Sequence, residues 1–355
     1  MNAPFFPVTP AVRWADPADR RVDAFLHDQP QATPFHASRW LAAVEAATGH
    51  RARLLVAEQG GRLVGVLPLS EIHSPIFGRV LASTGFAVSG GVLVEEGVPA
   101  EPLWQAATEL ATRLSCPSIE LRGGAVPPDG LAGWTRRSES HCGFVTALAA
   151  SDEAQLLAIP RKQRAEVRKG LEGALTVTIG SGPRDRAAHY AVYAESVRNL
   201  GTPVFPRALF AAVLDRFGTD ADILTVWSGP QPVASVLSLY HRGLVMPYWG
   251  GGTRDARPLR ANDRMYFELM RHARARGCHG FDFGRSKTGS GAYHFKRNWG
   301  FTPEPLVYAS WTASGQLARD ADPTSDRHRA LIAAWQRLPL RVANRVGPWI
   351  ARGLG

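Results

Sequence analysis

Cysteine is scarce in this chain of 355 residues, which contains only Cys116, Cys142 and Cys278. Their number is odd, and no two of them have the CxxC spacing of a redox or zinc-binding pair. The sequence therefore argues against a disulfide framework and against a bound metal. We expect a reducing compartment, the cytoplasm.

Long apolar runs are also missing, because none approaches the ~18 residues that a membrane-spanning helix needs. The first residues lack a cationic segment followed by an apolar core and a small-residue cleavage site, so they do not resemble a secretory signal. These absences favour a cytoplasmic protein. Peripheral attachment at the inner face of the cytoplasmic membrane is a second expectation.

Several familiar catalytic signatures are absent. The sequence has no GxSxG elbow, no HExxH helix, no GxGxxG turn after a strand, and no Cys and His cluster with metal-ligand spacing. We therefore expect no bound cofactor.

Acidic residues are outnumbered, since 31 Asp and Glu stand against 41 Lys and Arg, which gives a formal charge of +10 and a pI near 10.1. Such an excess favours anionic partners, among them nucleic acid, phosphorylated substrates and acidic lipid. The length suits two domains of roughly 150 residues each and a tail.

The chain repeats itself at a constant offset of 170 residues. A helix expected over 35–47 and strands expected over 53–57 and 63–69 have counterparts at this distance. Each half has the order helix, three strands, helix, strand, helix, which predicts an α/β (α+β) fold with two mixed sheets flanked by helices. We place the domains at residues 1–150 and 151–313, with a basic tail over 314–355. The matching pairs are Phe35 and Phe205, Trp40 and Phe210, Val44 and Leu214, Val56 and Val226, Val66 and Val236, and Leu69 and Leu239.

A basic helix is expected between the halves, over residues 152–175. Arg161, Arg164 and Arg168 recur at helical spacing and share one face. These arginines are candidates for binding an anionic substrate.

The segment 281–301, FDFGRSKTGSGAYHFKRNWGF, has the highest density of chemically able groups. Its strand should be buried, so Asp282, a candidate catalytic residue, needs a partner, for which Arg285 is the nearest candidate. Ser286, Lys287 and the backbone N–H groups of a Gly-rich turn precede a helix that begins near Gly291, where an anion is favoured.

The helix that follows carries a phenol, an ammonium and a guanidinium on one face, from Tyr293, Lys296 and Arg297. Acyl transfer to an amine needs an oxyanion donor and a proton for the leaving group. We assign the first role, or contact with the donor's phosphates, to Lys296 and the second to Tyr293. The alternative is that Tyr293, Phe295 and Trp299 pack the core while Lys296 and Arg297 form a solvated face.

A second Gly-rich element, YWGGGT, covers residues 248–253 and precedes an expected helix cap at Asn262 and Asp263. A loop that enters a helix can hold a pyrophosphate with its backbone amides. We therefore consider donor binding by four residues of this element: Gly251, Gly252, Thr253 and Arg254.

The tail over 327–355 has six arginines and no acidic residue, and Pro339 divides it into two amphipathic pieces. Their interleaved Trp and Arg residues suit an anionic membrane surface. The alternative is a pair of helices packed on the body of the protein.

Five long segments together resemble the FemAB-like proteins associated with exosortase/PEP-CTERM systems, which have a BioF2-like acetyltransferase domain. The resemblance extends from about Phe35 to Trp311 and implies two tandem folds like those of the GCN5-related N-acetyltransferases. The segments are IPRKQRAEVRKGLEGAL, YAVYAESVRNLGTPVFPRALF, ILTVWSGPQPVASVLSLY, GGGTRDARPLRANDRMYFELM and FDFGRSKTGSGAYHFKRNWGF.

This resemblance implies an N-acyltransferase. FemAB enzymes proper move an amino acid from aminoacyl-tRNA to the peptide of a peptidoglycan precursor, and a Phe-Lys pair like Phe295 and Lys296 lies by the reacting centre. Relatives near exopolysaccharide genes imply an amine acceptor on an anionic or lipid-linked precursor of the cell envelope or an exopolysaccharide. The chain lacks the coiled-coil arm of several tRNA-dependent members, so acyl-CoA stands beside aminoacyl-tRNA as the donor.

A second hypothesis comes from another class: a non-catalytic module that binds an anionic glycan, lipid or nucleic acid. It rests on the charge of +10 and on the arginine-rich tail. Saturable binding of an acyl donor would count against it.

Overall fold

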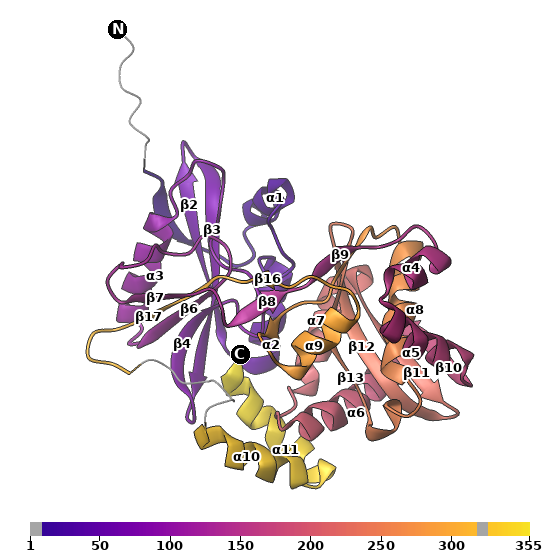
Figure 1. Cartoon of the computed structure of the whole chain (residues 1–355). Coiled ribbons are helices and arrows are strands. Elements are labelled where there is room, and N and C mark those ends of the chain that lie inside the picture. The colour runs from indigo at the N-terminus through magenta and orange to yellow at the C-terminus, as the bar shows by residue number, and fades with distance from the viewer. Residues whose placement is uncertain (1–8, 318–325) are drawn as a thin grey trace. The chain divides into compact units, whose positions relative to one another are not determined.

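The computed structural model describes residues 9–317 and 326–355, which form two compact units (Figure 1). One unit comprises Met1–Ser138, Val307–Ala321 and Gly353–Gly355, and the other comprises Glu139–Leu306 and Asp322–Arg352. Each unit has a mixed β-sheet flanked by helices. The predicted fold class is therefore confirmed.

The first unit has a main sheet with the strand order β1-β2-β3-β4-β6-β17-β7, and β5 pairs with β3. Leu54 and Val56 of β2 pack with α1, while Leu55 and Ala57 face α3. The elements are β1 (Ala11–Ala15), α1 (Arg20–Asp28), α2 (Ser38–Thr48), β2 (Arg51–Gln59), β3 (Arg62–Ser74), β4 (Gly78–Ser83), β5 (Leu93–Val94), α3 (Glu101–Arg113), β6 (Ser118–Arg122), β7 (Trp134–Arg137) and β17 (Tyr308–Thr312).

The second unit has a sheet with the strand order β10-β11-β12-β13-β14-β9 and a small sheet with the order β15-β8-β16. Its elements are β8 (His141–Gly143), β9 (Val145–Ala147), α4 (Asp152–Ala158), α5 (Arg161–Glu172), β10 (Leu175–Gly180), α6 (Pro183–Leu200), α7 (Arg207–Phe217), β11 (Ala221–Ser228), β12 (Gln231–His241), β13 (Leu244–Gly252), α8 (Ala261–Ala275), β14 (Gly280–Asp282), β15 (Ser286–Lys287), α9 (Gly291–Asn298), β16 (Glu304–Pro305), α10 (Asp326–Arg337) and α11 (Leu340–Ala351).

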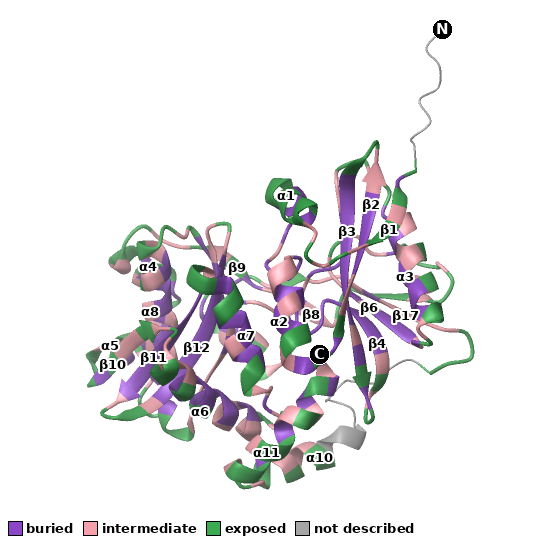
Figure 2. Cartoon of the chain, turned by 180° about the vertical axis from the view of Figure 1, so that it is seen from behind, coloured by how far each residue is buried: buried purple, intermediate pink, exposed green. Residues whose placement is uncertain are grey.

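Helices cover both faces of the second unit's sheet, and its central strands are buried (Figure 2). On one face, the Ser235 hydroxyl lies 3.1 Å from Nδ1 of His189 in α6. On the other, Leu224 and Val226 share a core cluster with Met265 of α8. Because successive strand residues point to opposite faces, a strand between two helical layers must be apolar almost throughout.

The repeat at an offset of 170 residues corresponds to real elements, since α2, β2 and β3 of the first unit match α7, β11 and β12 of the second. Each unit then makes one parallel contact, β4 with β6 and β13 with β14. The hairpin registers differ, because Val56 pairs with Val66 whereas Val226 pairs with Ala234. The duplication therefore preserves the elements and shifts the pairing within one hairpin.

The boundaries between the two units differ from the predicted ones. Val145–Ala147, which we had placed in a first domain of residues 1–150, pairs with β14 in the second unit. Tyr308–Thr312, which we had placed in a domain of residues 151–313, pairs with β6 and β7 in the first unit. The boundary therefore falls at residue 138, and the chain returns to the first unit at Val307.

Two expected elements differ in detail. The single helix over 152–175 is divided into α4 and α5 at Ile159 and Pro160, because proline lacks an N–H group and disfavours helical backbone before it. The Gly-rich element YWGGGT is not a loop, because its residues up to Gly252 belong to β13 and pair with β12.

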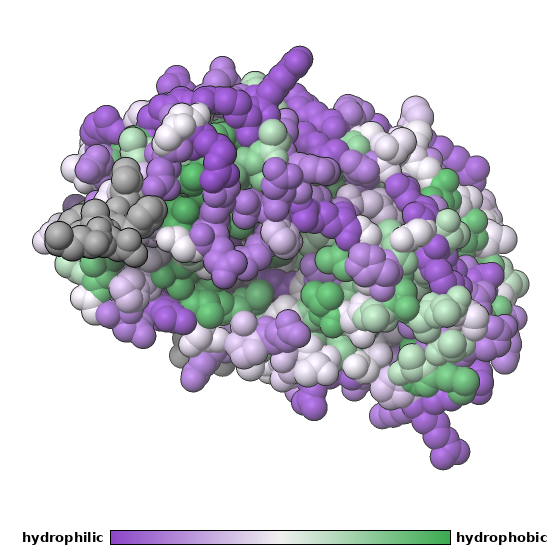
Figure 3. All heavy atoms as spheres, turned by 90° about the horizontal axis from the view of Figure 1, so that it is seen from above, coloured by the Kyte–Doolittle hydropathy of each residue, from purple (hydrophilic) through white to green (hydrophobic). Residues whose placement is uncertain are grey.

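Hydrophilic side chains cover most of the face in Figure 3, with smaller groups of hydrophobic residues between them. Within the described residues, no helix has both the length and the apolar character needed to span a bilayer.

The pairing of β9 with β14 in the second unit predicts the effect of Thr146→Pro. Proline removes a backbone donor from β9, at a cost of about 1 to 3 kcal/mol, so the amides of β13 and β14 should exchange hydrogen faster. Amides of β2 and β3 should keep their protection in hydrogen-exchange mass spectrometry. Thr135→Pro in β7 is the reciprocal control, and it should loosen β17 instead. Loss of protection in β6 with Thr146→Pro would contradict the assignment of β9 to the second unit's sheet.

Candidate active site

Lys296 lies in the short helix α9, which is fixed at its start by Ser290, whose hydroxyl accepts a hydrogen bond from the N–H of Tyr293 at 3.2 Å. The lysine is only 8% exposed. Its Nζ donates hydrogen bonds to the carbonyl oxygens of Gly284 at 3.2 Å and Arg285 at 3.0 Å. The alternative of a solvated face is therefore wrong for Lys296, although it holds for the exposed Arg297.

Asp282 ends β14 and accepts a hydrogen bond from the N–H of Gly284 at 2.8 Å. Burial raises the pKa of its carboxyl, and the hydrogen bond from Gly284 and the charge of Lys296 act against this shift. We had expected Arg285 as the cation beside Asp282, and the positive charge that lowers the pKa of its carboxyl is that of Lys296. The reason is the turn after β14, which brings α9 back over the strand.

Burial lowers the pKa of Lys296 to about 8, the Asp282 carboxylate opposes this effect, and the Arg285 guanidinium adds to it. Two aromatic rings surround the ammonium, with the Phe144 centroid at 5.3 Å and the Phe283 centroid at 5.7 Å from Nζ. An amine with a pKa in this range exists in both protonation states close to neutral pH, which is a property of general acids and bases.

Ser286 is a second unusual group in this region. It lies in β15, is 5% exposed, and pairs in backbone register with Cys142 of β8. Its hydroxyl has no hydrogen-bond partner among the described residues. Since a buried hydroxyl without a partner is costly, this group is a candidate for contact with a ligand. The adjacent cations Arg285 and Lys287, which we also expected at the site, are half-buried.

Tyr293 and Phe295 are half-buried and pack against the core of the second unit. The Tyr293 ring meets Phe144 edge-on with centroids 5.6 Å apart, and Phe295 lies 5.7 Å from Tyr266. Their packing accords with the alternative drawn from the sequence. It also fixes the rotation of α9, which turns Lys296 inward.

Helix α5, which carries the three arginines, begins close to the end of α9. A Cβ on Gly300, where φ is +91°, would lie 3.0 Å from Cδ of Pro160, the residue before α5. Arg161 and Arg168 are exposed, whereas Arg164 is half-buried and donates from Nε to the carbonyl of Ile159 at 3.2 Å. Two of the three therefore have side chains available to solvent.

The residues proposed for the donor have internal contacts. A Cβ on Gly251 would lie 2.2 Å from the Ser196 hydroxyl of α6, and one on Gly252 would lie 2.6 Å from Cβ of Ala256. The Thr253 N–H donates to Val233 at 2.9 Å, and the Arg254 N–H donates to Glu195 at 2.9 Å. The glycines thus allow helices to approach β13, and donor binding by this element stays a prediction.

Asn262 and Asp263 do not cap α8 with their side chains, because the cap residue is Arg260 with a left-handed φ of 55°. Asp263 accepts instead from Nε2 of Gln163 in α5 at 2.5 Å, and burial raises the pKa of its carboxyl. This pair joins α5 to α8.

Sequence reasoning missed one residue of the site, Phe144, which precedes β9 and contacts both Lys296 and Tyr293. Its signal in the sequence is an isolated aromatic residue among short strands, and the pairing of β9 with β14 brings it beside Lys296. Within the described residues, no group of three His, Cys, Asp or Glu side chains is placed to hold a metal ion.

The parallel strands β13 and β14 pair at Leu244 with Gly280 and at Val245 with Phe281, and then part. Both strands lie inside a segment that is similar to a known protein family. Residues 160–297 match a family model described as an acetyltransferase (GNAT) domain. This part of the second unit is thus similar to a GNAT domain, and Lys296 lies at the end of the matched segment.

Solved structures share the fold over most of the chain. The structure of FemX matches with a TM-score of 0.65 at 15% identity, covering 84% of this chain and 96% of that one. A tandem GNAT protein from the clavulanic acid biosynthesis pathway matches with a TM-score of 0.54 at 13% identity, covering 86% and 99%. The C-terminal domain of a putative lysylphosphatidylglycerol synthetase from Agrobacterium fabrum matches with a TM-score of 0.54 at 14% identity, covering 83% and 92%.

The TM-scores and coverages establish the likeness of fold, and the predicted arrangement of two tandem GNAT-like domains is confirmed. No curated protein matches the chain in sequence.

The lowered pKa of Lys296 predicts a pH-dependent cost to stability. Below pH 8 the lysine is charged in both states and the full cost of burying the ammonium is present, about 3 kcal/mol for a shift from 10.5 to about 8. Between pH 8 and 10.5 the folded state gives up this proton more readily, so stability rises with pH. The variant Lys296→Met should lack this rise in denaturant unfolding measured at several pH values.

Lys162→Met is the control, because Lys162 is an exposed lysine of α5. It should follow the wild-type pH dependence. An unfolding free energy of Lys296→Met that runs parallel to the wild type from pH 7 to 10.5 would rule out the lowered pKa.

Proposed function

We propose that this protein is a FemAB-like N-acyltransferase. It moves an acyl or aminoacyl group from an activated donor, acyl-CoA or aminoacyl-tRNA, to an amine of a cell-envelope or exopolysaccharide precursor. Within this class we assign it to the exosortase/PEP-CTERM type, on the motifs of residues 159–301.

One observation carries the proposal: the segment that matches an acetyltransferase (GNAT) model contains both the parting strands β13 and β14 and the buried lysine with a lowered pKa. The likeness in fold to FemX agrees with the FemAB resemblance, on which the envelope substrate rests, and the tandem GNAT protein, which is described as being without AcCoA, supports an acyl-CoA donor. The aminoacyl donor rests on the FemAB resemblance.

The chemistry follows from the charges around Lys296. The acceptor amine attacks the donor carbonyl, the bond to the leaving thiolate or ribose oxygen breaks, and a proton passes from the amine to the leaving group. The Lys296 ammonium stabilises the tetrahedral oxyanion and relays this proton, because it gives one proton to the leaving group and regains one from the acceptor amine. Asp282 opposes the effect of burial on Lys296 and so keeps part of the population charged.

Tyr293 is a second proton donor in this proposal, one turn before Lys296 on α9. Arg161 and Arg168 are exposed cations suited to the phosphates of a precursor. Ser286 contributes a buried hydroxyl without a partner among the described residues, which a bound substrate could engage.

A transfer assay tests the proposal. Purified protein is given acetyl-CoA or aminoacyl-tRNA in separate reactions, with nucleotide-linked and lipid-linked precursors extracted from cell envelopes, and products are weighed by mass spectrometry. Wild-type protein should add one acyl or aminoacyl group with one of the donors. Lys296→Ala should lower the rate at least about 100-fold, because general acid catalysis and the oxyanion contact are lost.

Two further variants sharpen the test. Lys296→Arg keeps a cation that stays protonated, so it should retain binding of the donor and lose transfer near neutral pH. Lys162→Ala, an exposed lysine of α5, should keep wild-type turnover. Full turnover of Lys296→Ala would refute the assignment of this residue, and saturable donor binding without transfer to any precursor would favour a binding module.

A further inference from the structure

The C-terminal helices α10 and α11 pack on α6 within the second unit (Figure 1). Arg198 of α6 donates from Nη1 to the carbonyls of Gln336 at 3.2 Å and Leu338 at 3.5 Å, which caps the end of α10 with a cation. Gln336 in turn donates from Nε2 to Asn199 at 3.1 Å. Of the two alternatives for the tail, packing on the body therefore occurs.

The packed face of α11 is made of small residues. Ala343, Gly347 and Ala351 recur every four residues and are buried. A Cβ on Gly347 would lie 3.1 Å from the N–H nitrogen of Val204, so a larger residue would push the helix away. Small residues allow close approach, and they leave the large apolar residues of α11 on its other side.

The outward face of α11 carries an apolar strip beside a cationic strip. Val342, Val346 and Trp349 are 45%, 39% and 58% exposed, although they are the large apolar residues of an amphipathic helix. At 3.6 residues per turn, Arg345 and Arg341 follow Trp349 around the helix on the side away from Val346. The apolar strip and the arginines thus face solvent together.

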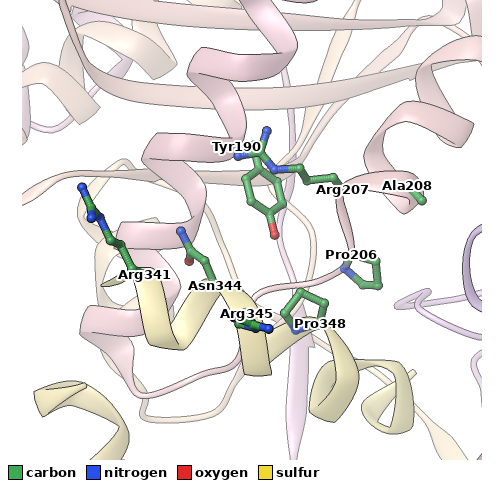
Figure 4. A pocket seen from close by; sticks show the side chains of 8 residues that line it. All are labelled: Tyr190, Pro206, Arg207, Ala208, Arg341, Asn344, Arg345 and Pro348. Carbon is green, nitrogen blue, oxygen red and sulfur yellow. The ribbon is translucent and has the colours of Figure 1, made fainter. Parts of the chain in front are cut away.

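The arginines border a cavity of about 590 Å³ between α11, α6 and the start of α7 (Figure 4). The eight residues that line it include three arginines and no carboxylate: Tyr190, Pro206, Arg207, Ala208, Arg341, Asn344, Arg345 and Pro348. The guanidinium of Arg207 lies over the Tyr190 ring at 4.1 Å, and the Tyr190 hydroxyl donates to Phe205 at 3.3 Å. These contacts hold one cation at the cavity.

We propose that the outward face of α11 docks this protein on an anionic lipid bilayer. Val342, Val346 and Trp349 enter the boundary between head groups and acyl chains, and the cavity lined by Arg207, Arg341 and Arg345 takes the phosphate of a lipid head group. A helix with one apolar strip and a basic flank binds membranes in this orientation. Each arginine near an anionic surface contributes about 1 kcal/mol.

The charge of the segment favours lipid over other occupants. Residues 327–355 contain six arginines and no acidic residue, so a second copy of this face would meet like charge. Nucleic acid would use the arginines and leave the apolar strip in water. A bilayer of anionic lipid satisfies both strips at once, and the docking does not depend on the transfer reaction.

Vesicle co-sedimentation of the full chain tests the proposal. Wild-type protein should partition onto vesicles that mix phosphatidylcholine and phosphatidylglycerol and remain in solution with phosphatidylcholine alone. Arg341→Gln with Arg345→Gln should weaken the partition roughly thirtyfold, since two cations are lost. Trp349→Ser should weaken it roughly tenfold through the loss of buried apolar surface.

Matched controls come from the same unit. Leu157→Ser removes an apolar residue of α4 that is 65% exposed, and Arg216→Gln removes an exposed arginine of α7. Both should partition like the wild type. Arg345→Lys should also keep the binding, because it keeps the charge. All of these side chains are at the surface, so the variants should melt at the wild-type temperature.

Three results would overturn the proposal. The first is equal partition onto neutral and anionic vesicles, or none onto either. The second is binding of the anionic vesicles that survives both Trp349→Ser and the double arginine change. The third is a dimer in sedimentation velocity that Trp349→Ser dissolves, or an oligonucleotide complex that needs the arginines and ignores Trp349→Ser.

Discussion

The buried ammonium of Lys296 is the constraint on which the second unit's candidate site depends. A charged amine that is 8% exposed must be held by fixed partners, and here these are two backbone carbonyls and a nearby carboxylate. The carbonyls belong to Gly284 and Arg285, which follow β14, and the carboxylate is that of Asp282. Strand β14, the turn after it and helix α9 therefore act together, and a change to any of them alters the charge of Lys296.

Among the described residues, only the second of the two repeated units has this arrangement of strand, turn and helix. In the first unit, β6 is followed by Gly123 and Gly124 and then by irregular chain up to β7, with no helix in the place of α9 among the described residues. Its own backbone also fills the region beside β6. A Cβ on Gly91 would lie 1.8 Å from the carbonyl oxygen of Gly123, and Val92 makes a parallel bridge with Gly124. The first unit thus repeats the fold and lacks room for the chemistry there.

The sequence predicted those parts of the molecule that depend on local pattern. Apolar periodicity located the repeated helices and strands, Pro339 marked the break between α10 and α11, and the spacing on α9 pointed to Lys296. It could not predict that Val145–Ala147 joins the second unit's sheet, because this strand is three residues long and has no distinctive pattern of its own. Nor could it predict that Lys296 is buried, which follows from the aromatic packing of Tyr293 and Phe295 on residues distant in sequence.

The direct measurement is a titration of the Lys296 amine by NMR in protein labelled at the lysine side chains. The chain has only four lysines, Lys162, Lys169, Lys287 and Lys296, so the resonance can be assigned from Lys296→Met. A pKa near 8 is expected, falling further in Asp282→Asn, because the carboxylate raises it. A pKa close to the ordinary 10.5, unchanged by Asp282→Asn, would contradict a buried, reactive lysine in this protein.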